Sequence, residues 1–417
     1  MSNTEKNTQI KNTYLATLAK REHQCVRVFT VKIQKNKLNK QQANHLKMLF
    51  VEAKWMKNHI LNLSNNTDVN VFDLKYTNIN TVTHLDRDKN KIESDIIYLS
   101  SQMKQEVLTD IHTSIRSLAK AKNKGLKVGA LKYVSEYNSI NLKQHGVSYK
   151  ITNGNRIKIQ GLKKPLKVNG LDQLDKLGVA YELANAKLLC KPSGYYIALT
   201  VYTEKEYNKV KKPLIGIDMG CQTSFTLSDG TKLNCIVEES EQIKRTQRKI
   251  ARSKKGSNNR WKLRIKLKKL YERDCNVKNN MSNQLCSIMN NYTVVMQDEQ
   301  LKVWKKYHGK KIQHSILGRV KSRLILREDT VVLDRFVPTT KLCRDCGNMH
   351  TNIKLWDREF ICPECGVVYD RDIHAAENMV WLYENIIGVE RTKFKPVDFK
   401  MTLLSYFEDR SRKPLIL

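Results

Sequence analysis

The chain has 417 residues, enough for two or three domains with cores of their own, and 40% of its residues are hydrophobic. Its 75 lysines and arginines against 41 acids give a formal net charge of +34 at pH 7. Such an excess of one sign repels itself in a compact fold, so it favours a polyanionic partner, with nucleic acid ahead of a membrane surface.

Membrane insertion and secretion are not indicated by the sequence. No apolar run approaches the roughly 18 residues that a spanning helix needs, and the first residues, MSNTEKNTQI, lack the apolar core of a signal peptide. We therefore expect no membrane partner and a cytoplasmic location in a prokaryotic cell, at the nucleoid when the protein is on DNA.

The first half of the chain predicts a β-rich domain with a helical insertion. Residues 1–20 are polar and are expected to be disordered, whereas 25–33 alternates like a strand. Helical spacing of apolar residues follows Asn39, and a second helix is predicted over about 101–121. Several short strand-like runs lie between 135 and 203, so a small β-barrel completed by the first strand is expected.

The second half predicts a mixed α/β domain. The runs LIGIDMG (214–220), YTVVMQ (292–297) and TVVLDRFVP (330–338) read as strands, with a helical, very basic segment at 241–290 between the first two. A short helix is predicted over about 373–385. The tail, 386–417, has no clear periodicity and is expected to be disordered.

Four cysteines have the spacing of a zinc ribbon. Cys343 and Cys346 form one CxxC pair, Cys362 and Cys365 form a second, and a glycine follows each pair. Two thiolates on one tight turn can share a metal, and two such turns close a tetrahedral site. A redox pair is the alternative for one CxxC, but two at this spacing favour zinc. Four protein ligands leave no open position, so this zinc is expected to be structural.

Acidic residues at the ends of predicted elements form a second candidate metal site. Asp218 ends an apolar strand, Asp298 and Glu299 follow another, and Asp370 and Asp372 precede a helix that carries small residues. Carboxylates that converge on two magnesium ions could activate water for phosphodiester hydrolysis. Alternatively, these acids could cap helices or pair with lysines.

The basic segment between Lys244 and Arg273 is the main candidate for phosphate binding. Lysine or arginine recurs at nearly every second position there, which suits a channel wall better than a core. A solvated amphipathic helix is the alternative reading. The candidate nucleic-acid ligands are Arg245, Arg248, Arg252, Arg260 and Arg264.

From about residue 95 to 390 the chain resembles the TnpB family, transposon-encoded RNA-guided nucleases similar to miniature type V CRISPR effectors. The resemblance rests on GIDMG, the acidic strand end at 294–301, the CxxC pairs and DRDIHAAEN, in that order. It implies an RNase H-like RuvC nuclease interrupted by a zinc ribbon, and an N-terminal β-barrel with a helical recognition lobe. The implied segments are a disordered 1–20, the barrel and its insertion at 21–205, RuvC at 206–340 and 368–385, the ribbon at 341–367, and the tail at 386–417.

Residue by residue, the resemblance implies that Asp218 and Asp372 are the first and third catalytic acids, with His374 in place of the usual asparagine. At the second acidic position the chain has Gln297 instead of glutamate. Because side chains alternate along a strand, Glu299 would share the face of Gln297 if the strand continued, and Asp298 would point away. Glu299 is therefore the predicted second acid, and Asp298 is its rival if the strand ends earlier.

The function implied by the resemblance is that of an RNA-guided DNA endonuclease of a transposable element, with guide RNA and double-stranded DNA as partners. A nuclease-dead RNA-guided repressor, a miniature type V CRISPR effector and a transposase are the alternatives. Gln297 favours the repressor, whereas Asp218, Asp372 and the paired cysteines favour the nuclease.

Overall fold

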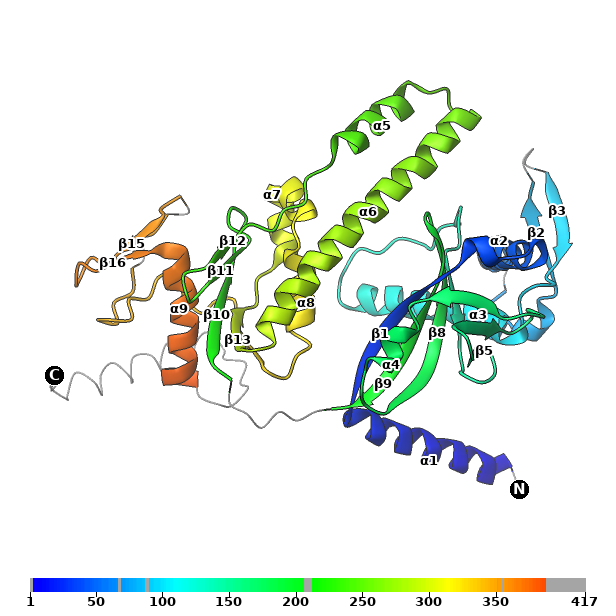
Figure 1. The fold of residues 1–417 in the computed structure, drawn as a ribbon, viewed down its shortest axis with the longest axis horizontal. Coiled ribbons are helices and arrows are strands. Elements are labelled where there is room, and N and C mark those ends of the chain that lie inside the picture. Colours follow the sequence, from blue (N-terminus) through cyan, green and yellow to red (C-terminus); the bar gives the residue numbers. More distant parts are fainter. Residues whose placement is uncertain are drawn as a thin grey trace. The chain divides into compact units, whose positions relative to one another are not determined.

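The computed structural model describes residues 3–66, 69–86, 90–205, 212–350, 352–354 and 356–387. The chain divides into two compact units, Met1–Tyr207 and Asn208–Leu417, and each is described here by itself (Figure 1). Most of the tail predicted at 386–417 lies outside the described residues. In the segments described, no helix combines the length and apolar character needed to cross a membrane.

A seven-stranded antiparallel sheet, strongly curved toward a barrel, forms the body of the first unit. The first strand, β1, pairs with β9 on one side and β7 on the other, so it completes the sheet as the sequence predicted. In spatial order the strands are β4 (Ser139–Leu142), β8 (Tyr181–Lys191), β9 (Gly194–Glu204), β1 (Gln24–Ile33), β7 (Leu166–Asn169), β6 (Arg156–Ile159) and β5 (Tyr149–Thr152).

The long connection from β1 to β4 carries the predicted helical insertion. Asn39 caps its first helix, because its side-chain oxygen accepts a hydrogen bond of 2.7 Å from the N–H of Gln42. The apolar stripe of that helix is buried in the core of the unit. The insertion comprises α2 (Lys40–Asn66), the hairpin β2 (Thr81–Leu85) and β3 (Lys91–Asp95), and α3 (Ser101–Asn123), with short 3-10 turns at Lys35–Lys37, Val71–Asp73 and Tyr76–Asn78; α4 (Asp172–Asp175) lies beyond it.

The N-terminal segment differs from the prediction of disorder, because Asn3–Glu22 forms the helix α1. Its last turn is fastened to the barrel by ion pairs of 2.8 Å from Lys20 and Arg21 to Glu182 on β8. The Arg21 guanidinium also lies 3.5 Å from the centre of the Tyr202 ring on β9. These partners are far away in sequence, so local composition gave no sign of them.

A five-stranded mixed sheet forms the body of the second unit. Strands β10 (Leu214–Met219), β13 (Thr293–Gln297) and β14 (Thr330–Leu333) are parallel neighbours, and β11 (Phe225–Leu227) and β12 (Lys232–Leu233) add antiparallel strands beside β10. The predicted strand at 330–338 therefore ends early, at Leu333.

Helices cover both faces of this sheet. Met296 of β13 packs in a cluster with α6 (Asn258–Met289) and α8 (Leu317–Leu324), whereas its neighbour Val295 packs against α9 (Arg371–Leu382). Alternation along the strand thus separates two hydrophobic layers. The remaining elements are α5 (Glu241–Arg252), α7 (Leu301–His314), β15 (Glu359–Ile361), β16 (Val368–Asp370) and a π-helical turn at Tyr383–Ile387.

Candidate metal centres

Strand β10 and helix α9 approach each other unusually closely. A Cβ atom on Gly216 would lie 1.9 Å from the carbonyl oxygen of Ala376 and 2.8 Å from its carbonyl carbon. Ala375 and Ala376 are buried at this contact, so small side chains on the helix and a missing one on the strand permit it. The contact sets the start of α9, and therefore Asp372, against the part of β10 that carries Asp218.

The predicted acids lie within electrostatic range of one another. Burial, and then repulsion from the carboxylates of Asp372 and Glu299, raises the pKa of Asp218 to about 7, although the nearby Arg371 acts in the opposite direction. Burial also raises the pKa of Glu299, against the influence of Lys321. The fold therefore brings acids from the segment after β13 and from the start of α9 within electrostatic range of Asp218 on β10.

These acids fit hard cations, but as an open set rather than a closed cage. Among the described residues, the four cysteines are the group of metal-binding side chains whose ligand atoms all lie within 4.8 Å of one another. Two magnesium ions about 4 Å apart need no such closeness, because each can take only one or two carboxylates and complete its shell with water and phosphate oxygens. Asp218, Glu299 and Asp372 suit that arrangement.

The second acidic position reaches the site by a turn and not by strand alternation. Strand β13 ends at Gln297, and the N–H of Glu299 donates a hydrogen bond of 2.9 Å to the Gln297 carbonyl. The expectation that Gln297 and Glu299 share one face of a continuing strand is therefore wrong. Asp298 is exposed and forms an ion pair of 2.7 Å with Lys321.

Gln297 is a buried structural residue that the sequence reading placed in the acidic site. Its amide nitrogen donates hydrogen bonds to the carbonyls of Asp334 at 3.1 Å and Val337 at 2.7 Å. Its amide oxygen accepts one of 3.1 Å from the Thr339 hydroxyl. A carboxylate could not donate those two bonds, so the amide is required by the loop that follows β14.

Asp370 and His374 support the site without belonging to it. Asp370 caps α9 through hydrogen bonds from the N–H groups of Asp372 and Ile373. His374 is fully buried, lies 2.7 Å from the Leu342 carbonyl through Nε2, and stacks on Phe360 at 4.2 Å between ring centres. It therefore joins α9 to the cysteine-bearing segment.

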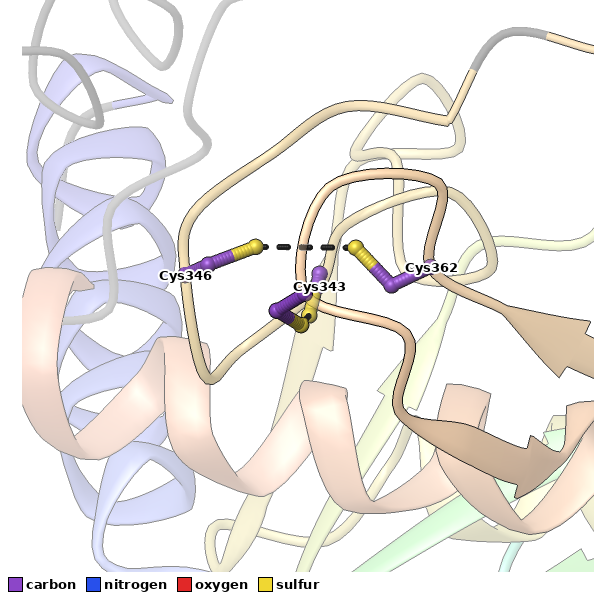
Figure 2. Close-up of side chains that lie close together, drawn as sticks. Cys343, Cys346 and Cys362 are labelled. Carbon is purple, nitrogen blue, oxygen red and sulfur yellow. Dashed lines mark hydrogen bonds between the residues drawn. The ribbon is translucent and has the colours of Figure 1, made fainter.

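The four cysteines form one cluster, as the sequence predicted. The sulfur atoms of Cys343 and Cys365 are 3.7 Å apart, and those of Cys346 and Cys362 are 3.5 Å apart. Figure 2 shows Cys346 and Cys362 pointing toward each other with Cys343 beside them. Zinc–sulfur bonds of about 2.3 Å in a tetrahedron place sulfurs about 3.8 Å apart, so these residues fit one zinc ion.

Backbone N–H groups favour the thiolate form of Cys362, whereas burial raises the pKa of Cys343 and Cys346. Gly347 and Gly366 have φ of +77° and +72°, and their N–H groups donate to the carbonyls of Cys343 and Cys362. Burial opposes ionisation of Cys362, but the N–H groups of Cys365 and Glu364 and the neighbouring thiols lower its pKa to about 6. Thiolates are the species that bind zinc, so the backbone around Cys362 favours metal binding at that cysteine.

We expect one zinc ion per chain, because four thiolates surround a single position. Cys362→Ser should lose that zinc and unfold residues 341–367, while Cys286→Ser, a change at a cysteine outside the cluster, should keep it. Elemental analysis and limited proteolysis measure both effects. Protein purified without chelator that contained no zinc would contradict the assignment.

The basic segment forms two helices that pack as a hairpin and extend away from the sheet (Figure 1). Four of the five predicted arginines lie exposed on it, and no ion pair is seen for them among the described residues: Arg245, Arg248, Arg252 and Arg264. Arg260 differs from the prediction, because its guanidinium donates to the carbonyls of Ile250 at 2.9 Å and Ser253 at 2.7 Å. It closes the turn between α5 and α6 and is a structural residue.

Comparisons with known proteins agree with this organisation. The family described as Cas12f1-like, TNB domain, matches residues 326–379, which include all four cysteines, Asp370 and Asp372. A putative RNA-guided DNA endonuclease of Streptomyces pristinaespiralis is 33% identical over 181 residues, 40% of this chain and 44% of that protein.

Two further relatives point the same way. The putative RNA-guided DNA endonuclease InsQ of Escherichia coli K12 is 26% identical over 44% of this chain and 52% of its own length. The TnpB-like protein aq_aa05 of Aquifex aeolicus is 26% identical over 53% of this chain and 85% of its own length. The chain thus matches about half the length of the first two relatives, and the resemblance seen in the sequence is confirmed.

Proposed function

We propose that this TnpB-family chain is an RNA-guided DNA endonuclease that hydrolyses DNA phosphodiester bonds with magnesium, at a target paired with guide RNA beside a short flanking motif. The observation that carries the proposal is the group of three acids beside β10: burial, and then the nearby carboxylates of Asp372 and Glu299, raise the pKa of Asp218 to about 7. Buried carboxylates close to one another destabilise the ionised form, and such groups with strongly shifted pKa values are typical of catalytic cation sites.

In this proposal Asp218, Glu299 and Asp372 hold two magnesium ions. When bound, the ions would activate a water and stabilise the leaving oxygen. Asp218 would hold metal in its carboxylate form, so metal binding would release to solvent the proton that its raised pKa retains. Asp370 orients the start of α9, and Gln297 fixes the loop that follows β14.

The same proposal assigns the parts of the chain. Residues 206–340 and 368–385 would be an RNase H-like RuvC domain interrupted by the ribbon at 341–367, and 21–205 a wedge barrel with a recognition insertion. The hairpin arginines Arg245, Arg248, Arg252 and Arg264 would contact phosphates, since they are exposed on elements with very few acids. Guide RNA and double-stranded DNA are the partners, in the cytoplasm of a prokaryotic cell.

The decisive experiment is to purify the chain with its co-expressed RNA, sequence that RNA, and test cutting of a matching target beside a randomised flanking library. RNA-dependent cutting in magnesium, absent from Asp218→Asn, is the expected result. RNA-directed binding without cutting in magnesium or manganese would instead establish the repressor. The genes next to the coding sequence distinguish a transposon from a CRISPR setting.

We expect Asp218→Asn to unfold at a higher temperature than the unaltered protein in chelator at pH 8. The folded-state pKa of about 7 lies above the ordinary 3.8, so the folded protein binds more protons between these values and loses stability as pH rises through them. Asparagine at this position does not titrate, so the variant lacks this dependence of stability on pH. The difference in melting temperature between the variant and the unaltered protein should therefore vanish near about pH 4.

Magnesium should raise the melting temperature of the unaltered protein but not that of Asp218→Asn, because the carboxylate is the proposed ligand. Affinity for RNA should be the same in both proteins, since phosphates are bound by lysine and arginine. A large loss of RNA affinity in the folded variant would refute this division of roles.

A further inference from the structure

The first unit contains a polar hollow that the proposed nuclease chemistry does not use. Its volume is about 330 Å³, within the range of small-ligand sites, and it lies between the start of α2 and the loop from β6 to β7. No carboxylate lines it. The residues that line it include Asn39, Gln41, Asn44, Tyr98, Lys163 and Lys164.

One wall of the hollow is held by a buried carboxylate. Glu52 of α2 is 1% exposed and accepts hydrogen bonds from the N–H groups of Ile97, Tyr98 and Leu99 at 3.0, 2.8 and 2.9 Å. A buried glutamate that accepts three backbone hydrogens fixes the turn on which Tyr98 stands. The Tyr98 hydroxyl is held in addition, since it accepts a hydrogen bond of 3.3 Å from Asn44.

The opposite wall is held equally firmly. Gln42 is 7% exposed, and its amide donates to the carbonyls of Lys164 at 3.4 Å and Pro165 at 3.3 Å. The His45 ring packs edge-on against Tyr98, with ring centres 5.1 Å apart. On its other contact, a Cβ atom on Gly161 would lie 3.3 Å from the His45 ring. The hollow is therefore pre-formed, and its shape is set by buried side chains.

The groups left to face a ligand have a definite chemistry. The ammonium groups of Lys163 and Lys164 are exposed and form no ion pair within the described parts of the chain. Gln41 and Asn44 offer amide donors and acceptors of the kind that read a base edge, and Tyr98 offers a ring for stacking. Positive charge, amides and an aromatic ring, with no acid, match a phosphate joined to a heterocyclic base.

We propose that this hollow binds one unpaired nucleotide of a single strand, with Lys163 and Lys164 on its phosphate, Tyr98 against its base, and Gln41 and Asn44 on the base edge. The volume of the hollow, about 330 Å³, suits a ligand of the size of one nucleotide. The site contains none of the carboxylates of the second unit, so this proposal can be tested separately from the proposed nuclease activity.

Photo-crosslinking of the full chain, freed of bound RNA, tests the proposal. The probe is a single-stranded RNA of about ten nucleotides with one 4-thiouridine, in about 0.3 M salt to weaken non-specific phosphate binding. The peptide that contains Tyr98 should be the main crosslinked product. Tyr98→Leu, which keeps the backbone bond to Glu52, and Lys163→Ala/Lys164→Ala should each reduce that product about tenfold.

The matched control is Lys150→Ala/Lys158→Ala, which removes the same charge from facing positions on β5 and β6. It should change the yield less than about twofold. Asp218→Asn should crosslink like the unaltered protein, which separates this site from the nuclease proposal. A single-stranded DNA with 4-thiothymidine is tested in parallel. Equal crosslinking of the two probes would show that the nucleotide can come from RNA or DNA, and crosslinking of the RNA probe alone would show that it comes from RNA. Equal yields from the hollow variants and the control, or crosslinking of duplex in preference to single strands, would overturn the proposal.

Discussion

Gly216→Ala is expected to abolish cutting and to lower the free energy of unfolding by about 3 kcal/mol or more. The added Cβ would meet the carbonyl oxygen of Ala376 at 1.9 Å, and this neighbour is backbone, so no side chain can rotate to relieve the overlap. Helix α9 must then move away from β10 and take Asp372 with it. Displacement of a catalytic group by about 1 Å can cost about 100-fold in rate.

Denaturant unfolding and single-turnover cleavage measure the two effects separately. Gly318→Ala is the matched control, because a Cβ there meets only the Leu301 side chain at the ordinary distance of 3.8 Å. That helical position should gain up to about 1 kcal/mol of stability and keep full activity. Cutting by Gly216→Ala at the unaltered rate would show that the close approach does not position Asp372.

Glu299→Gln should eliminate cutting in magnesium and leave target binding intact. The change keeps the size of the side chain and removes the charge that repels Asp218, so it tests metal binding and not packing. Asp298→Asn should be mild, because its carboxylate is exposed and its ion pair with Lys321 is worth no more than about 1 kcal/mol. The reverse order, with Asp298→Asn inactive and Glu299→Gln cutting normally, would move the site to Asp298.

Gln297→Ala completes this series with a different outcome. It leaves the carbonyls of Asp334 and Val337 and the hydroxyl of Thr339 without their partner, and each such buried loss costs about 1–3 kcal/mol. We therefore expect a marked loss of stability and not the mild tuning that a residue facing the metals would give. Gln297→Glu should also be destabilising, because a carboxylate cannot donate hydrogen bonds to the two carbonyls.

The sequence by itself determined the features that depend on local spacing. Two CxxC pairs with following glycines predict a four-thiolate cluster because a knuckle is a turn of a few residues, and the structure forms it from those residues. Apolar periodicity likewise predicted α2, β1 and β10, because each buries one face or lies within a core. The choice of Asp218 and Asp372 as candidate catalytic acids came from the resemblance to the TnpB family, because their position at the ends of such elements left helix capping and pairing with lysines open.

Only the tertiary structure decided what depends on partners distant in the chain. Strand alternation selected Glu299 for a reason that does not hold, since β13 ends at Gln297, and the loop at 334–339 holds that amide. Arg260 looked identical to its neighbours until the fold directed it to two carbonyls, and α1 looked unstructured until Glu182 was placed beside Arg21. A side chain's role depends on which backbone groups and charges it meets, and at these positions long-range contacts override local pattern.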